Sequence, residues 1–100
     1  MEIQEIKEPV AQRELTAGTE TVLVTIGKPT LFDDGGDYYC PYSIEIGDKK
    51  KLSYAGGVDS VQAIQLAMKK IGVDLAHLGR KHNTPITWLP DTPDETGFPL

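Results

Sequence analysis

The chain has 100 residues, of which 39% are hydrophobic and 25% charged, and its formal net charge is -5. This length favours a single domain over residues 1–100, and the composition excludes a disordered chain, which would be less hydrophobic and more highly charged. The acidic balance argues against nucleic-acid binding, because a phosphate backbone would be repelled.

Cysteine content and the first residues bear on the cellular compartment. Cys40 is the only cysteine, so no intrachain disulfide forms, which is typical of a reducing compartment. The opening sequence MEIQEIKEPV lacks the basic start and apolar run of a signal peptide. No apolar stretch approaches the roughly 18 residues of a membrane-spanning helix. We therefore expect a cytoplasmic protein without membrane association.

The first third of the chain predicts a frayed end and two strands. Residues 1–8 are charged and are expected to fray. Residues 9–15 are consistent with an edge strand that has Pro9 at its first position. Residues 21–26 give the clearest strand signal, because nearly all are β-branched. Their apolar side chains alternate onto both faces, which predicts a strand that is central or covered on both sides.

A turn and a hairpin are expected next. Glycines and aspartates make residues 32–37 a turn. From 38 to 46 the apolar residues alternate with period two, as in a half-buried strand. Pro41 cannot donate to a ladder, so this strand should lie at an edge or contain a bulge there. Residues 47–49 then reverse the chain into a partner strand at 51–55.

The next segment predicts the main helix. Asp59 can cap its first turn, with Gln62 three residues later as in a capping box. Gly72 is expected either to be tolerated or to break the helix, and Gly79 is a candidate C-cap. The helical period predicts an apolar stripe that docks on the sheet, formed by Val61, Ile64, Met68, Ile71, Leu75 and Leu78.

Four prolines between residues 85 and 99 exclude a terminal helix. A short strand is expected within 86–89, followed by an extended tail over 90–100 that Phe98 pins to the core. The predicted fold class is therefore α+β, a mostly antiparallel sheet of about four strands with one main helix packed on one face. The predicted core consists of Val22, Val24, Ile26, Cys40, Tyr42, Ile44, Leu52, Tyr54, Ile64, Met68, Ile71, Leu75 and Trp88.

Four short motifs carry a resemblance to a known family. They are GDYYCPY at 36–42, YAGGVDSVQA at 54–63, TWL at 87–89 and GFP at 97–99. Together they resemble a family of small bacterial proteins of unknown function, over roughly residues 10–100. The resemblance implies a bacterial protein with a single domain, and it brings no catalytic residue with it.

No pattern in the chain indicates a catalytic or metal centre. Cys40 shares a strand face with apolar residues, so we expect a buried and inert thiol. His77 and His82 are five residues apart, which does not suit joint metal binding on a helix, and both are expected at the surface. The glycine pair before Asp59 lacks the phosphate-loop patterns, and the carboxylate would repel an anion. We expect no cofactor and no bound metal.

Charged clusters have ordinary structural explanations at this stage. Asp33, Asp34 and Asp37 suit a turn, since their spacing lacks the carboxylate ladder of a calcium loop. The basic runs at 49–51 and 80–82 lie at a hairpin tip and a helix end, and both are interpreted as solvated surface.

Two functional hypotheses follow, from different classes. The first is a non-enzymatic protein that binds a protein partner or forms a homodimer. Its candidate surface comprises Tyr39, Leu66, Val73, Asp33, Asp34 and Asp37. The alternative is a small enzyme or ligand-binding domain that uses the Asp33–Asp37 loop and Tyr39. A polar pocket joining those residues to His77 or His82 would favour the alternative.

Overall fold

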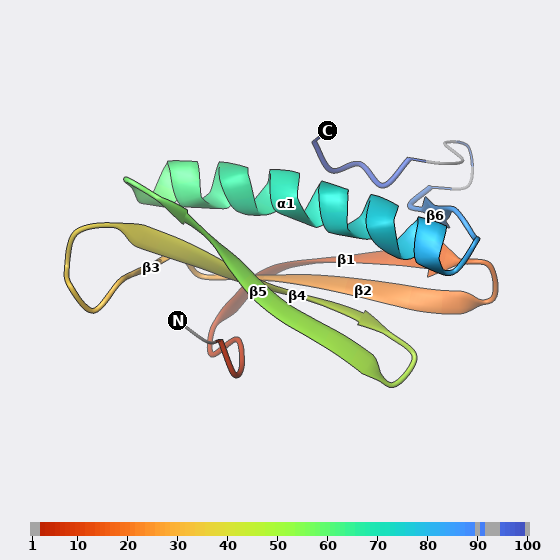
Figure 1. The fold of residues 1–100 in the computed structure, drawn as a ribbon, viewed down its shortest axis with the longest axis horizontal. Coiled ribbons are helices and arrows are strands. Elements are labelled where there is room, and N and C mark those ends of the chain that lie inside the picture. The colour runs from red at the N-terminus through yellow and green to blue at the C-terminus, as the bar shows by residue number, and fades with distance from the viewer. Residues whose placement is uncertain (1–2, 90, 92–94, 100) are drawn as a thin grey trace.

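A computed structural model describes residues 3–89, 91 and 95–99. These residues form an antiparallel sheet with one long helix lying across one face (Figure 1). In chain order the elements are β1 (Pro9–Ala17), β2 (Glu20–Gly27), β3 (Thr30–Leu31), β4 (Tyr38–Ile46), β5 (Lys49–Gly57), α1 (Ser60–Lys81) and β6 (Ile86–Thr87).

The four long strands form a meander in the order β1, β2, β4, β5, each antiparallel to the next. β3 pairs with the start of β4, and β6 pairs with the end of β1. The predicted α+β class is confirmed. The short strand expected within 86–89 is present as β6, and β3 is the strand that the sequence missed, because two residues are too few to show a period.

β4 is a central strand, so the edge or bulge predicted at Pro41 is wrong. Its ladder to β5 runs without a register shift, and Pro41 pairs with Tyr54. On the other side, β2 pairs with residues 42–46 and β3 with residues 38–39. Pro41 therefore faces the break between those two strands, where no ladder needs its missing N–H.

The helix begins as predicted but ends later. The Asp59 carboxylate accepts a hydrogen bond from the Gln62 amide at 2.8 Å, and the Gln62 side chain accepts one from the Val58 amide at 2.8 Å. The helix continues through Gly72. Its C-cap is His82 rather than the predicted Gly79. Asn83 follows with φ 52°, a left-handed conformation that ends helices and that asparagine tolerates.

The buried face of α1 differs from the predicted stripe. Val61, expected against the sheet, is 61% exposed, so that part of the prediction is wrong. The prediction followed only the large apolar residues, whereas small side chains bring the helix close to β5. A Cβ on Gly57 would lie 2.5 Å from the Ala63 nitrogen. The buried face consists of Ala63, Ala67, Ile71, Gly72 and Leu75.

Most predicted core residues are buried or half-buried, and Trp88 is the exception at 39% exposure. The Trp88 ring instead lies beside the Arg13 guanidinium, 3.6 Å from the ring centre, at the outer rim of the core. The core also contains residues that the sequence did not single out for it: Leu15, Ala17, Ile46, Ala55 and Ile86.

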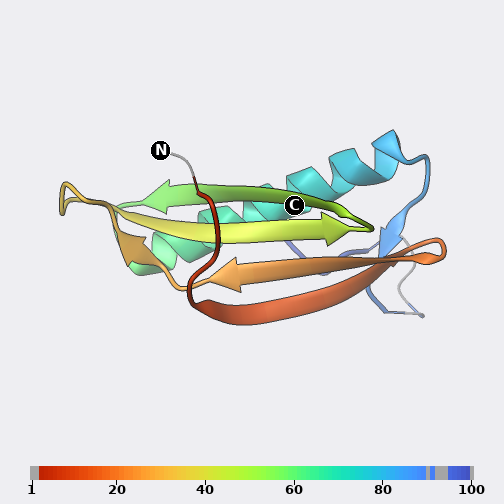
Figure 2. The same cartoon turned by 90° about the horizontal axis from the view of Figure 1, so that it is seen from below.

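The segment before β1 crosses the sheet face opposite to the helix (Figure 2). Ile6 lies against Gly27, where an added Cβ would be 2.8 Å from the Ile6 Cγ2 atom. The Lys28 amide donates to the Glu8 carbonyl at 2.8 Å. Part of the second sheet face is thus covered by the chain's own beginning.

Candidate functional site

Of the predicted tail over 90–100, residues 90, 92–94 and 100 lie outside the described residues, and residues 96–99 are fixed against both the helix and the sheet. Phe98 is 8% exposed, as the sequence predicted for the residue that pins the tail. Arg13 lies 4.8 Å from the Phe98 ring centre and donates to the Thr96 carbonyl at 3.2 Å. The tail crosses α1 at Gly72, where an added Cβ would be 2.5 Å from the Pro99 oxygen. Arg13 therefore links the tail to β1.

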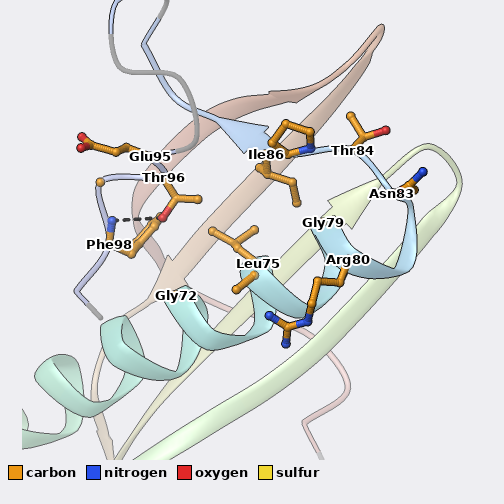
Figure 3. Close-up of a pocket in the computed structure, with 13 residues that line it drawn as sticks. Gly72, Leu75, Gly79, Arg80, Asn83, Thr84, Ile86, Glu95, Thr96 and Phe98 are labelled. Atoms are coloured by element: carbon orange, nitrogen blue, oxygen red, sulfur yellow. Dashed lines mark hydrogen bonds between the residues drawn. The ribbon is translucent and has the colours of Figure 1, made fainter.

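A hollow of about 620 Å³ opens between the second half of α1, the turn after it and the tail (Figure 3). Its floor is apolar, formed by Leu75, Ile86 and Phe98. The polar groups at its rim are engaged locally: the Arg80 guanidinium lies 3.3 Å from the His77 ring, and the Thr96 hydroxyl accepts from the Phe98 amide. These described side chains do not converge on a point where a substrate could react.

A second hollow is an apolar groove between α1 and β1, with a volume of about 320 Å³. The helix lies closest to β4 and β5, so the groove forms on its β1 side, over a sheet face whose residues Leu15, Val22 and Val24 remain buried. We call it the β1 groove. It is lined by Val10, Ala11, Gln12, Arg13, Val24, Ile26, Ile64, Met68 and Phe98.

The two rims of the β1 groove carry exposed apolar side chains. On the strand rim Val10 is 58% exposed. On the helix rim Val61 is 61% exposed, and it lies three and seven residues before Ile64 and Met68, on the same helical flank. Val61, predicted on the stripe that docks on the sheet, is thus exposed on the flank of α1 that carries Ile64 and Met68.

β1 also has a largely open backbone edge beside the groove. β2 pairs along its whole length, whereas on the other edge, among the described residues, β6 pairs with Thr16 and Ala17 alone. Residues 10–12 and Glu14 are exposed. An unpaired strand edge presents N–H and C=O groups that can pair with another chain.

The opposite edge of the sheet is protected by lysines. Lys70, on α1, donates to the Tyr54 carbonyl at 2.9 Å and to the Ser53 hydroxyl at 3.2 Å. β5 itself begins with three consecutive lysines. Charged side chains of this kind discourage strand pairing, so the two edges of the sheet are not equivalent.

A partly buried polar contact fixes the helix over β4 and β5. The Tyr42 hydroxyl donates to the Asp74 carboxylate, and the Lys51 ammonium lies 3.2 Å from the same carboxylate. Burial, together with the Asp74 hydrogen bond, raises the pKa of Tyr42 above its ordinary value. A tyrosine that keeps its proton serves here as a donor that orients the helix.

The residues of the ligand-binding alternative do not come together. The loop after β3, which carries Asp33, Asp34 and Asp37, lies at one end of the molecule, and the end of α1 lies at the other (Figure 1). Tyr39 is half-buried in an aromatic cluster, 5.1 Å from Phe32 by ring centres. The molecule is 42 Å long, and the loop and the histidines lie toward opposite ends of it, so no single pocket can join them.

Leu66 and Val73 lie where the sequence predicted, exposed on the side of α1 that faces away from the sheet, at 41% and 62%. His77 and His82 are also exposed. Cys40 is buried and donates to the Gly27 carbonyl at 3.5 Å, and burial raises the pKa of its thiol to about 11. The expected inert packing role of Cys40 agrees with this environment.

The described part of the chain contains no group of three or more His, Cys, Asp or Glu side chains placed to hold a metal ion. Within the same residues no helix is long and apolar enough to cross a membrane.

Comparison with known proteins gives a family but no activity. The family model of a domain of unknown function, DUF6968, matches residues 11–100. The chain belongs to this family. No curated protein matches it, and no solved structure does. The DUF6968 match contains every residue that lines the β1 groove except Val10.

Sequence reasoning missed the β1 groove of this DUF6968 chain. Only one signal pointed to it: Val61 extends the apolar stripe of the helix beyond what one sheet face can cover. The open edge of β1 depends on where β6 pairs, and a two-residue strand leaves no such trace in the sequence.

Proposed function

We propose that this DUF6968 protein is a non-enzymatic interaction domain that binds an extended segment of a protein partner along the open edge of β1. The observation that carries the proposal is the β1 groove itself, an apolar trough bordered by a helix and by a strand edge that the described residues pair only at Thr16 and Ala17. An extended peptide that adds to such an edge gains main-chain hydrogen bonds, and alternate side chains enter the groove.

Two further features support binding rather than catalysis. The one thiol is buried, and this burial raises its pKa to about 11, which makes the reactive thiolate still rarer. The two imidazoles are exposed at one end of α1, and the aspartates of the small-enzyme alternative lie at the other end of the molecule. A buried free thiol also suits a reducing compartment, and we propose that the protein acts in the bacterial cytoplasm.

The proposal predicts the form of a ligand. Peptides selected from a displayed random library should carry apolar side chains at alternate positions, because successive side chains of a strand point to opposite faces. Amide NMR signals of residues 10–15 should shift on titration with a selected peptide. The double variant Val10→Lys with Val61→Lys replaces both rim residues. It should weaken binding of the selected peptide by about tenfold or more, which corresponds to at least about 1.4 kcal/mol.

A matched pair of variants tests the surface that the sequence favoured. Leu66→Lys with Val73→Lys adds the same charge on the exposed face of α1 and should leave peptide binding unchanged. Loss of binding in this pair, with the Val10 and Val61 pair unaffected, would reject the groove in favour of the helix surface. Binding confined to a second copy of the chain, seen as a dimer that the groove variants dissociate, would make the protein its own partner.

A further inference from the structure

The two basic runs of the sequence meet at one end of the molecule. Figure 1 shows the turn between β4 and β5 at the same end as the last turn of α1. A hollow of about 210 Å³ lies between them. We call it the basic hollow. The chain has a net charge of -5, yet the charged and imidazole side chains of this lining are mostly basic. They are Lys49, Lys50, Lys51, Lys81, His82 and one carboxylate, Asp74.

Two of these lysines already have partners, and two do not. Lys51 pairs with Asp74 at 3.2 Å, and Lys50 pairs with Glu45 at 3.4 Å. Within the described residues Lys49 and Lys81 take part in no ion pair or side-chain hydrogen bond, and both are exposed. The hollow therefore presents free positive charge from two separate elements.

The helix alone does not account for this arrangement. Cations in the last turn of a helix interact favourably with the negative end of its dipole, which explains Lys81. Lys49 comes from the first position of β5, and nothing in helix stability requires a lysine there. The convergence of the two is a property of the tertiary structure.

The floor of the hollow is apolar, formed by Ile44, Ile46 and Leu78. A bare anion would gain nothing from such a floor. At about 210 Å³ the hollow is also smaller than the roughly 300–1,000 Å³ that small-molecule sites occupy, and it suits a single apolar side chain.

We infer that the basic hollow binds an acidic segment of a protein partner, with an apolar side chain seated on the floor and flanking carboxylates beside Lys49 and Lys81. Charge complementarity sets the partner, because these cations lie on an otherwise acidic molecule. A nucleic acid fits poorly, since the rest of the surface repels its backbone. This surface is separate from the β1 groove, so either can fail without the other.

The probe is the peptide Asp-Asp-Phe-Asp-Asp with blocked ends, titrated into isotope-labelled protein and followed by amide NMR. The signals of Lys49, Leu78, Lys81 and His82 should shift. Replacing the central Phe by Ser should weaken binding, because the apolar floor then loses its contact. Higher salt should weaken it too, since exposed charges are screened.

The decisive variants are Lys49→Glu with Lys81→Glu, expected to weaken binding about tenfold or more. The milder double variant Lys49→Gln with Lys81→Gln should also weaken binding. It tests the same two charges if the two glutamates disturb the fold. Lys7→Glu with Lys69→Glu gives the same change in net charge elsewhere and should leave binding nearly unchanged.

Three results would overturn the inference. One is equal loss of binding in both pairs of glutamate variants, which would mean that only overall charge matters. Another is unchanged binding when Lys49 and Lys81 are both replaced. The third is tighter binding of a short RNA at the same residues, which would assign the hollow to a different class of partner. The groove variants Val10→Lys with Val61→Lys should leave the peptide bound, which separates this result from the proposed function.

Discussion

At the scale of single residues, Cys40 shows how position in the sheet decides chemistry. Its side chain lies in the break between β2 and β3, and its thiol donates to the Gly27 carbonyl there. The side chain is inaccessible to solvent, and desolvation of the thiolate raises the pKa to about 11 from 9.0. Pro41 faces the same break, where its missing N–H is not needed for pairing. The break therefore supplies an acceptor for Cys40 and tolerates the proline beside it.

This environment predicts slow labelling of Cys40 by thiol reagents. The thiolate is the reactive form, so the labelling rate of the folded protein should keep rising with pH up to about 11. In denaturant the rate should be far higher and level off near the ordinary pKa of 9.0. The measurement is a pH series of labelling rates with and without denaturant. Fast labelling of the folded protein that levels off near pH 9.0 would show an exposed thiol.

At the scale of elements, the helix shows which parts of the fold the sequence could predict. The cap at Asp59 and the strand over 38–46 depend on local rules, and both were predictable. The expected half-buried character of that strand is wrong, because residues 40–44 are all buried. The buried face of α1 was not, because alanines carry little hydrophobic signal. Ala63 and Ala67 are fully buried, and they are the residues that allow close approach to β5.

The candidate sites were less predictable than the fold. Asp33 and Tyr39 were singled out because their residue types suit binding, but topology carries them away from the histidines. Val61 was assigned to the stripe that docks on the sheet but is exposed on the flank of α1 beside the β1 groove. Lys49 was assigned to solvated surface but lines the basic hollow. Sites made from distant segments depend on strand order, which no local period encodes.

Two leucines on α1 test the docking of the helix. Leu75 is fully buried, so Leu75→Ala should cost about 2–5 kcal/mol, the usual range for a buried leucine. Leu66 is 41% exposed, and Leu66→Ala should cost well under about 1 kcal/mol. Thermal unfolding should show the difference, since about 1 kcal/mol shifts Tm by roughly 4–8 °C in a domain of this size. Equal melting of the two variants would mean that both helix faces are covered.

At the scale of the whole molecule, the first and last segments complete opposite layers. The segment before β1 lies on one face of the sheet, and the tail lies over α1 on the other side (Figures 1 and 2). Arg13 connects the tail to β1 through Trp88 and Phe98. The tail also closes one end of the β1 groove, because Phe98 lines it. Tail docking and groove shape are therefore coupled.

Gly72 is the residue through which this coupling can be measured. In the interior of a helix, replacing glycine by alanine normally gains about 1 kcal/mol. Here the new Cβ would meet the Pro99 carbonyl oxygen at 2.5 Å, a backbone atom that moves only if the tail moves. Overpacking of this kind costs about 1–3 kcal/mol, so Gly72→Ala should destabilise the protein or leave it no more stable.

Releasing the tail should reverse the sign of that effect. In a Phe98→Ala background the aromatic anchor is lost, the tail can shift, and Gly72→Ala should stabilise by up to about 1 kcal/mol. Urea denaturation of the four proteins in this cycle gives the coupling between helix and tail directly. Lys69→Gly, on the exposed face of α1, is the control and should cost about 1 kcal/mol in both backgrounds. If Gly72→Ala changes stability equally with and without Phe98, the tail does not press on the helix, and the end of the β1 groove must be held by Arg13 alone.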